Sequence, residues 1–134
     1  MQKRNVESQF ARSFVGGPQE IHFRVTPLSR QWTARPHLWR PPTDLYEREK
    51  EYLVRVEIAG MQDAELNIAI EDRQLAIYGD RQHPAEQAAY YQLEVRFGEF
   101  LTALELPGPV DVDHIHADYK DGFLLLTLPK LGAA

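Results

Sequence analysis

The segment ELNIAIEDRQLAIYG, Glu65–Gly79, carries the clearest structural signal in this chain. Apolar side chains occupy every second position in each half, and the polar triplet Glu71-Asp72-Arg73 separates the two halves. An apolar residue at every second position places these side chains on one face of a β-strand. Two such runs around a short polar turn therefore predict a tight β-hairpin.

Strand-like alternation continues on both sides of this hairpin. Residues 52–58 alternate before it, and a loop over 81–89, an alternating segment over 90–97 and a strand over 98–106 follow it. The last predicted strand, 123–128, is apolar on both faces, so one face should meet the core and the other should be covered. Seven or so short strands without a long amphipathic helix predict an all-β, immunoglobulin-like antiparallel β-sandwich.

Length and composition limit the classes of protein to consider. A chain of 134 residues can bury one hydrophobic core, so one domain plus a tail is expected. No window is long and apolar enough to predict a membrane span, and the first residues lack an apolar signal core, so a cytoplasmic protein is expected. The absence of cysteine excludes disulfides, thiolate nucleophiles and cysteine-ligated zinc.

Charge divides the chain into two parts. Residues 1–40 carry a net charge of +5, and residues 41–134 carry −10. The basic residues are dispersed and form no nucleic-acid-binding motif, so no nucleic acid partner is expected. Five aromatic residues instead suggest an arm with apolar contact points that lies partly on the acidic body of its own or a neighbouring subunit: Phe10, Phe14, Phe23, Trp32 and Trp39. A disordered tail with incidental aromatic residues is the alternative.

Catalytic and metal sites find little support in the sequence. His114 and His116 lie near several aspartates, but no third ligand has a clear spacing, so a polar strand edge is the favoured interpretation. The serines all lie in residues 1–40, outside any nucleophile motif, and no glycine-rich phosphate loop is present. No enzyme activity, metal or cofactor is therefore expected.

Residues from about 41 to 130 resemble the alpha-crystallin domain of small heat-shock proteins, the Hsp20 family, of the bacterial type. The matching motifs, in chain order, are PTDLYE (42–47), VEIAGM (56–61), LAIYGDR (75–81), GEF (98–100), LP (106–107) and ADYKDGFLLLTLPK (117–130). The last contains the family signature A-x-x-x-x-G-x-L. The resemblance implies an arm over 1–40, flexible or partly helical, that binds clients through its aromatic residues and serves assembly. It also implies an alpha-crystallin domain over 41–130 and a short tail over 131–134.

The resemblance also implies a function. It predicts an ATP-independent molecular chaperone, a holdase, that binds unfolding client proteins and prevents their aggregation under heat or other stress. Its expected partners are further copies of itself, in a dimer or a higher oligomer assembled through the arm, and ATP-dependent chaperones for client release. The alternative is a p23-like or CS-domain co-chaperone adaptor built on the same sandwich.

One segment matches the strand that bacterial and plant relatives insert into the sheet of a partner. Its residues are Tyr90, Tyr91, Gln92, Leu93 and Glu94. The resemblance therefore predicts a strand-swapped homodimer, with an ordinary hairpin strand within one chain as the alternative. Thr102 stands where the family commonly has an arginine near the dimer interface, so the ion pairs of the dimer should differ.

The family also has an apolar groove, usually filled by an I-x-I/V motif that follows the L-P-K sequence. Here the sequence after Lys130 is Leu-Gly-Ala-Ala, without this motif, so the groove should stay open for clients or accept the arm around residues 21–25. The expected lining residues are Leu66, Ile68, Ile70, Leu124 and Leu126. The alternative is that these side chains pack in the core.

Overall fold

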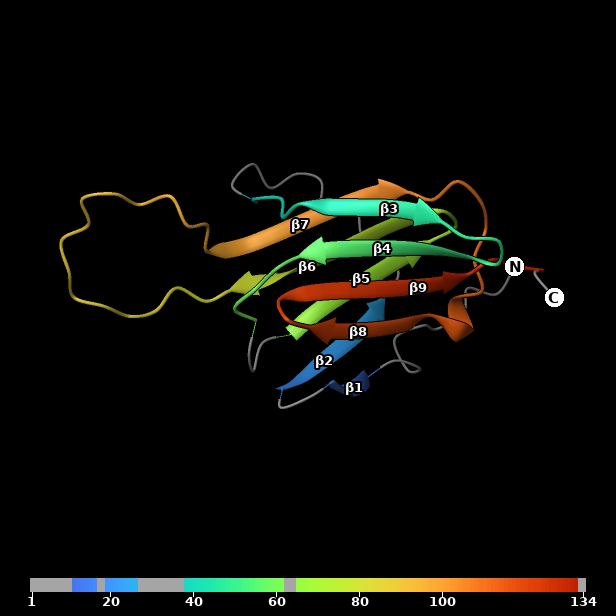
Figure 1. Cartoon of the computed structure of the whole chain (residues 1–134), viewed down its shortest axis with the longest axis horizontal. Helices are drawn as coiled ribbons and strands as arrows, with labels where there is room; N and C mark the ends of the chain where they lie inside the picture. The colour runs from blue at the N-terminus through green and yellow to red at the C-terminus, as the bar shows by residue number, and fades with distance from the viewer. Residues whose placement is uncertain (1–10, 17–18, 27–37, 62–64, 133–134) are drawn as a thin grey trace.

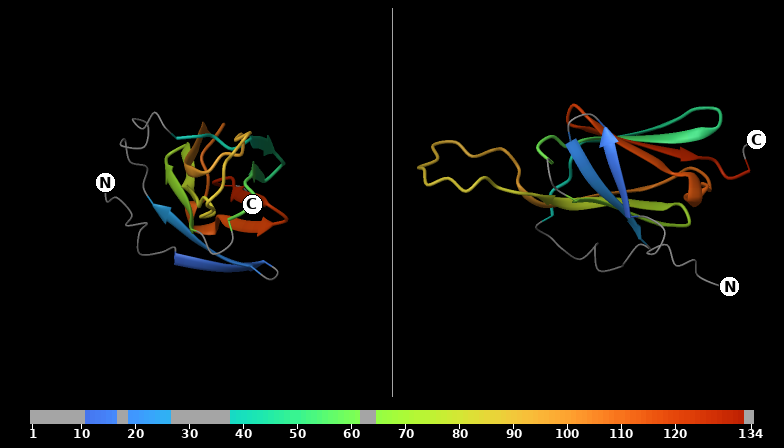
Figure 2. Two further views of the ribbon diagram at one scale, coloured as in Figure 1. Left: turned by 90° about the vertical axis from the view of Figure 1, so that its left-hand side faces the viewer. Right: turned by 90° about the horizontal axis from the view of Figure 1, so that it is seen from below.

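Two β-sheets face each other in the computed structural model, which describes residues 11–16, 19–26, 38–61 and 65–132 (Figures 1 and 2). The first sheet has the strand order β1-β2-β5-β6-β7, and the second has the order β3-β4-β9-β8. The strands are β1 (Ala11–Gly16), β2 (Gln19–Thr26), β3 (Thr43–Glu47), β4 (Glu51–Glu57), β5 (Glu65–Glu71), β6 (Gln74–Arg81), β7 (Gly98–Glu105), β8 (His116–Lys120) and β9 (Phe123–Pro129). A short 3-10 helix, Val112–His114, precedes β8. The predicted all-β sandwich is confirmed.

The hairpin predicted from the alternation over 65–79 is β5 and β6. Glu71 pairs with Gln74, so two residues form the turn, and Asp72 takes a positive φ of 55°. Aspartate tolerates this left-handed conformation better than most residues. The alternating leucine and isoleucine side chains of both strands are buried in the core between the sheets, as the alternation predicts.

The signature A-x-x-x-x-G-x-L forms a second hairpin, β8 and β9. Asp121 and Gly122 make its turn with φ values of 53° and 83°, the pair of positive values that favours a glycine in two-residue hairpin loops. A Cβ atom on Gly122 would lie 3.0 Å from the Cβ atom of Ala59. Ala117 and Leu124, the other signature residues, are buried in the core, so each of the three signature residues has a steric role.

Replacing Gly122 with alanine should lower the free energy of unfolding by about 1–3 kcal/mol, because the left-handed backbone is strained and the new Cβ meets Ala59. Gly98→Ala is the matched control: its φ is 92°, but no atom lies within 4 Å of the added Cβ. Urea unfolding should show the smaller loss for the Gly98 variant. Equal losses would mean that the contact with Ala59 contributes nothing.

The hydrophobic core fills the space between the two sheets, and its largest fully buried side chain is Phe100 of β7. Tyr119 of β8 is buried with it and donates a hydrogen bond from its hydroxyl to the carbonyl oxygen of Ile58 at 2.8 Å. Burial raises the pKa of the Tyr119 hydroxyl, because it disfavours the phenolate. The fold therefore holds this proton more tightly than the unfolded chain does.

Tyr119→Phe should cost about 1 kcal/mol of stability at neutral pH, because the Ile58 carbonyl loses its partner. The contribution of Tyr119 is full below the pKa of an unfolded tyrosine, roughly 10, and is lost as the pH rises through the higher folded-state pKa. Urea unfolding at about pH 8 and about pH 11 should therefore show a smaller difference in the free energy of unfolding between wild type and Tyr119→Phe at the higher pH. A constant difference would contradict this.

The N-terminal strands differ from the expectation of an irregular or partly helical arm. β1 and β2, called the arm hairpin below, pair antiparallel with each other, and β2 pairs with the edge of β5. This second pairing is parallel, with residue 23 opposite Leu66 and residue 25 opposite Ile68, so the first sheet is mixed. The arm hairpin also lies against β8, at the open side of the sandwich (Figure 1).

The strand predicted over 90–97 is absent from the structure of the single chain. Residues 82–97, called the projecting loop below, extend away from the sandwich between β6 and β7 (Figures 1 and 2). A β-strand is stabilised by a neighbour that pairs with its backbone. No described strand of this chain pairs with the segment, so the segment does not form a strand in the single chain.

The outer face of β9 is apolar at two positions, as its sequence indicates. Leu125 is half-buried between Arg55 of β4 and Asp118 of β8, which are its partners in register. Phe123, at the start of the strand, is 43% exposed. The expected cover of this face is therefore incomplete among the described residues.

Candidate interaction site

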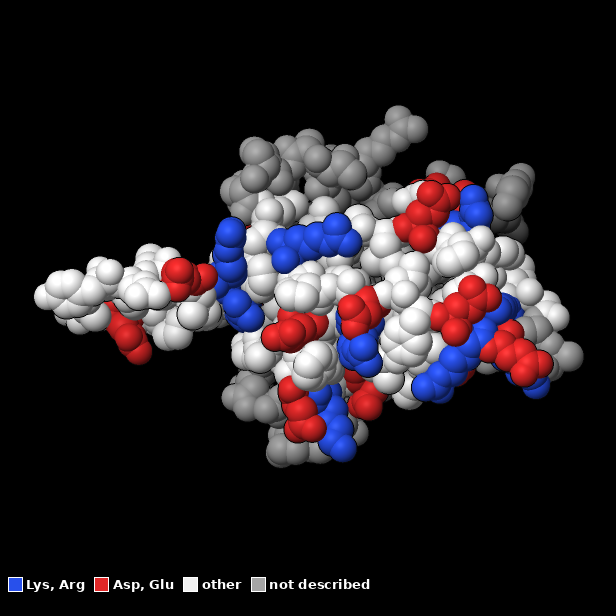
Figure 3. Space-filling model, turned by 45° about the horizontal axis from the view of Figure 1, so that its top comes forward, with Lys and Arg blue, Asp and Glu red and all other residues white. Residues whose placement is uncertain are grey.

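The projecting loop presents apolar side chains to solvent. Tyr91 is 100% exposed and Leu93 is 64% exposed, and Tyr90 and Val95 are exposed beside them. All five residues of the predicted swapping strand, 90–94, lie on this loop and are exposed. The space-filling view shows few charged side chains along it, in contrast to the sandwich (Figure 3). Exposed apolar side chains on a segment far from the core mark a contact surface.

The loop also has internal contacts that give it a shape. A hollow of about 230 Å³ lies between its two halves and is lined mainly by apolar and aromatic residues. The ring of His83 lies at its base, with its centroid 4.8 Å from that of Phe97 and 6.1 Å from that of Tyr90. The loop is therefore partly organised before any partner binds.

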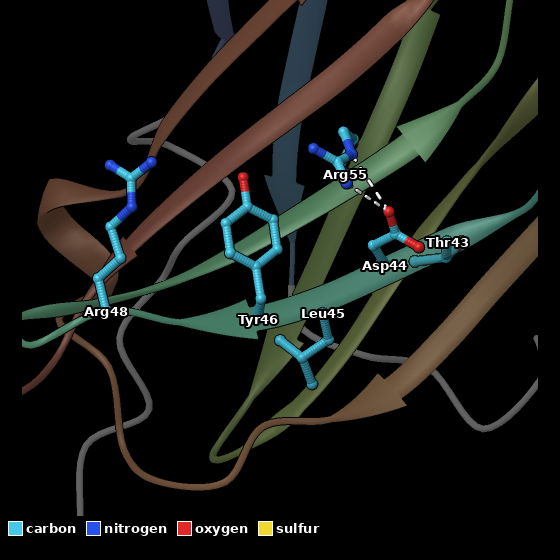
Figure 4. Close-up of a pocket in the computed structure, with 6 residues that line it drawn as sticks. All are labelled: Thr43, Asp44, Leu45, Tyr46, Arg48 and Arg55. Atoms are coloured by element: carbon cyan, nitrogen blue, oxygen red, sulfur yellow. Dashed lines mark hydrogen bonds and ion pairs between the residues drawn. The ribbon is translucent and has the colours of Figure 1, made fainter.

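The first edge that could receive such a strand is β3. This strand ends the second sheet, and no described strand pairs with its outer side. Leu45 is 37% exposed and points to the opposite side of β3 from Tyr46 (Figure 4). An unpaired edge offers backbone donors and acceptors to another chain.

A shallow hollow of about 650 Å³ lies beside this edge, lined by residues 43–46, Arg48 and Arg55 (Figure 4). Arg55 donates two hydrogen bonds to Asp44, at 2.7 and 3.2 Å, and its guanidinium lies 5.4 Å from the centroid of the Tyr46 ring. The bonds to Asp44 raise the pKa of Arg55. Both partners are exposed, so the ion pair contributes little to stability and mainly orders the surface.

The second edge, at β5, is occupied by β2 of the arm hairpin. The residues expected to line an open groove all lie in the hydrophobic core, with at most 4% of any side chain exposed: Leu66, Ile68, Ile70, Leu124 and Leu126. The interpretation of these side chains as an open groove is therefore wrong for this structure. Alternation correctly placed them on one face, but that face is covered by the opposite sheet.

The aromatic residues of the predicted client-binding arm have different positions. Phe10 and Trp32 lie outside the described residues, whereas Phe14 and Phe23 lie on β1 and β2. Trp39 does not belong to a free arm, which corrects the prediction for this residue. It is half-buried against Phe100, with ring centroids 5.6 Å apart.

Trp39 is held on the edge of β7 by three hydrogen bonds. Its indole nitrogen donates to the Gly98 carbonyl at 3.2 Å, its backbone nitrogen donates to Glu99 at 3.3 Å, and its carbonyl accepts from Leu101 at 2.9 Å. The last residues of the predicted arm are thus part of the sandwich.

Thr102, the residue in place of the family's arginine, is fully buried rather than at a surface. Its hydroxyl lies 2.8 Å from that of Thr43 on β3, and the two form a hydrogen bond. The bond satisfies a buried polar group and joins the inner side of β3 to β7. It thereby helps to fix the edge strand β3.

Arg81 at the end of β6 was not predicted as a functional residue. Its guanidinium contacts the base of the projecting loop and the ring of Trp39. Sequence places Arg81 in the LAIYGDR motif, but its partners lie 15 to 42 positions away.

The polar cluster near β8 is a local structure. His114 Nδ1 lies 2.7 Å from Oδ2 of Asp111, and Oδ1 of the same carboxylate accepts a hydrogen bond from the Asp113 backbone nitrogen at the start of the 3-10 helix. The described residues hold no group of three or more His, Cys, Asp or Glu that could ligate a metal ion. Within the same residues, no helix is long and apolar enough to cross a membrane.

Comparison with known proteins gives a consistent family. The chain is 34% identical over 92 residues to small heat shock protein C4 of Rickettsia felis, covering 67% of this chain and 56% of the relative. It is 31% identical over 124 residues to the 19.0 kDa class II heat shock protein of Oryza sativa, covering 84% and 71%. The chain thus spans little more than half of the length of the Rickettsia relative.

Solved structures share the fold. The crystal structure of hspA from Xanthomonas axonopodis superposes with a TM-score of 0.64 at 26% identity, covering 72% of this chain and 98% of that chain. Heat shock protein 16.0 from Schizosaccharomyces pombe superposes with a TM-score of 0.63, also at 26% identity, covering 71% and 90%. The sequence model described as the Hsp20/alpha crystallin family matches residues 44–134, and the chain belongs to this family.

Proposed function

We propose that this protein is a holdase: it binds unfolding client proteins, keeps them from aggregating and uses no ATP. Small heat-shock proteins are ATP-independent chaperones rather than enzymes, and membership of the family supports this function. The observation that carries the proposal is the side of β5 that, among the described residues, β2 of the arm hairpin covers, beside apolar side chains of the core, on a chain with a net charge of −5. A charged body keeps such a surface in solution.

The working unit is a homodimer in which each projecting loop pairs with β3 of the other copy. The loop has exposed backbone and apolar side chains but no strand partner, and β3 has an unpaired edge with Leu45 exposed on it. Pairing would bury Tyr91 and Leu93 and complete both backbone ladders. Tyr90 could keep its hydroxyl in water at the rim.

The arm hairpin serves as a cover for the other edge of the sandwich. It occupies the backbone of β5, under which the side chains of Leu66, Ile68 and Ile70 reach the core. Its departure would leave an unpaired strand edge beside apolar side chains, which is the kind of surface an unfolded chain can bind. Clients would thus compete with the arm hairpin for β5.

Release follows mass action, because no nucleotide is consumed, and ATP-dependent chaperones would take clients onward. A cytoplasmic location stays a prediction. The relatives named above are heat-shock proteins, so the alternative of a p23-like adaptor gains no support from them.

Heating a mixture of this protein with a heat-labile enzyme, followed by size-exclusion chromatography, tests the holdase function. The expected result is a soluble peak that contains both proteins, formed equally with and without ATP. If the enzyme sediments alone and this protein elutes at its unheated position, the function is wrong. The control replaces this protein with lysozyme, a soluble protein of similar size to this chain. It shows whether an unrelated protein gives the same peak with the heated enzyme.

A further inference from the structure

Three segments that are distant in the sequence meet at the side chain of Arg81. Its Nε and Nη2 atoms both donate to the carbonyl oxygen of Arg96, Nε at 2.8 Å, and Nη1 donates to the carbonyl oxygen of Ala59 at 3.2 Å. The guanidinium also lies 4.5 Å from the Trp39 ring and 5.3 Å from the centroid of the Phe97 ring. Arg81 therefore joins the start and the end of the projecting loop to two other parts of the chain. One is the segment between β4 and β5, and the other is the last part of the arm.

These contacts use properties that only arginine combines. The guanidinium has several donors in a rigid plane, and its faces can stack on aromatic rings while its edge donates hydrogen bonds. Burial at this junction lowers the pKa of Arg81, and the group stays charged because an arginine pKa lies far above neutrality. The donor is ionised, so its hydrogen bonds to the two carbonyl oxygens are charge-assisted and stronger than bonds between neutral groups.

The stack also connects the loop with the arm. Trp39 is fixed to Gly98 by its indole hydrogen bond, and Gly98 directly follows Phe97 at the end of the projecting loop. Both ends of the loop are thus held against the same ring system. Beyond this base, the residues of the loop from 82 to 96 are exposed.

We propose that the Trp39–Arg81–Phe97 stack fixes the direction in which the projecting loop leaves the sandwich, and that Arg81 is the positioning residue for dimerisation. This inference rests on the proposed docking of the loop on β3 of a second copy. A loop with free ends would sample many directions, and only a fraction of them would reach that edge. The apparent dissociation constant rises in inverse proportion to that fraction.

The test measures the dimer dissociation constant of the full chain by sedimentation velocity for wild type, Arg81→Gln and Arg81→Lys. Gln removes the charge and the forked donors, and we expect its dissociation constant to be about tenfold higher than that of wild type. Lys keeps the charge near the rings but loses the fork, so its value should fall between the two.

Arg73→Gln is the matched control. Arg73 also tethers a loop through its guanidinium, donating to Pro107 O at 3.2 Å and to Glu105 at 3.1 Å, but at the opposite end of β6 from Arg81. The dimer dissociation constant of the Arg73→Gln variant should stay within about twofold of the wild-type value, because distant sites act independently. An equal weakening by Arg73→Gln and Arg81→Gln would overturn the proposal, because it would show a general loss of stability.

A second readout follows the stack itself. In a Trp32→Phe background Trp39 is the single tryptophan, and Arg81→Gln should shift its emission because the cation above the ring is gone. Unchanged emission, or unchanged dimer affinity, would overturn the proposal. Should Arg81→Gln fail to fold, Phe97→Leu removes one aromatic face of the stack and keeps an apolar side chain, and the same loss of dimer affinity is required of it.

The results also separate this inference from the function on which it rests. A wild-type chain that stays monomeric at all concentrations would overturn the docking of the loop, and with it any role of Arg81 in dimerisation. A wild-type dimer that Arg81→Gln leaves unchanged would overturn only the positioning role.

Discussion

The double variant Tyr91→Asp, Leu93→Asp is expected to be a monomer at concentrations where the wild type is a dimer. Both side chains are exposed in the single chain, and docking on β3 would bury them. A buried carboxylate without a partner costs several kcal/mol, so the dissociation constant should rise more than about a hundredfold. Sedimentation velocity measures the change directly.

The matched control for this variant lies in the same loop. Ala88→Asp with Ala89→Asp adds the same charge at two other exposed positions that precede the swapping segment. This control should remain dimeric. Monomers in both variants would mean that charge on the loop, rather than burial of residues 91 and 93, decides association.

The contact itself can be located because the chain has no cysteine. A mixture of the single variants Leu45→Cys and Leu93→Cys should form a disulfide between two chains under mild oxidation, since docking brings the loop to the edge of β3. Gln74→Cys, exposed on the other sheet, should not crosslink with Leu93→Cys. Equal crosslinking of both pairs would contradict the docking of the loop on β3.

Removal of residues 1–26 is expected to expose the β5 edge. The amides of β5 point alternately to β2 and to β6, so loss of the arm hairpin should speed hydrogen exchange at one alternating set by about tenfold or more. Trp39 remains in this variant, so its bonds to β7 are kept. Exchange measured residue by residue by NMR gives the result.

The amides of β5 that bond to β6 are the internal control, because β6 is unchanged by the deletion. They should exchange at the wild-type rate. If neither set changes, the arm hairpin does not protect β5 in solution, and its role as a cover is wrong. If both sets change equally, the deletion has destabilised the sheet as a whole.

The sequence predicted the sandwich because its hairpins are local. The alternation over 65–79 and its polar turn need no distant partner to be recognised, and the structure forms β5 and β6 there. Over 90–97 the same reasoning predicts a strand that joins the sheet of a second copy, and this stays a prediction. Alternation indicates that a segment can pair, but pairing requires a neighbour, and the single chain offers none among the described strands.

The candidate site was harder to predict because burial and long-range contacts decide it. Period-two patterning placed Leu66 and Leu124 on inward faces but could not show that the opposite sheet covers them. Its position in the sequence predicts that Trp39 belongs to the arm, whereas its hydrogen bonds go to residues 98–101. The role of Arg81 depends on such distant contacts as well.

Light scattering of a heat-denatured enzyme, recorded with increasing amounts of this protein and with or without ATP, tests the central claim most directly. The proposed function predicts that scattering is suppressed near stoichiometric amounts and that ATP makes no difference. No suppression at any ratio, or suppression that requires ATP, would contradict the assignment of this chain as an ATP-independent holdase.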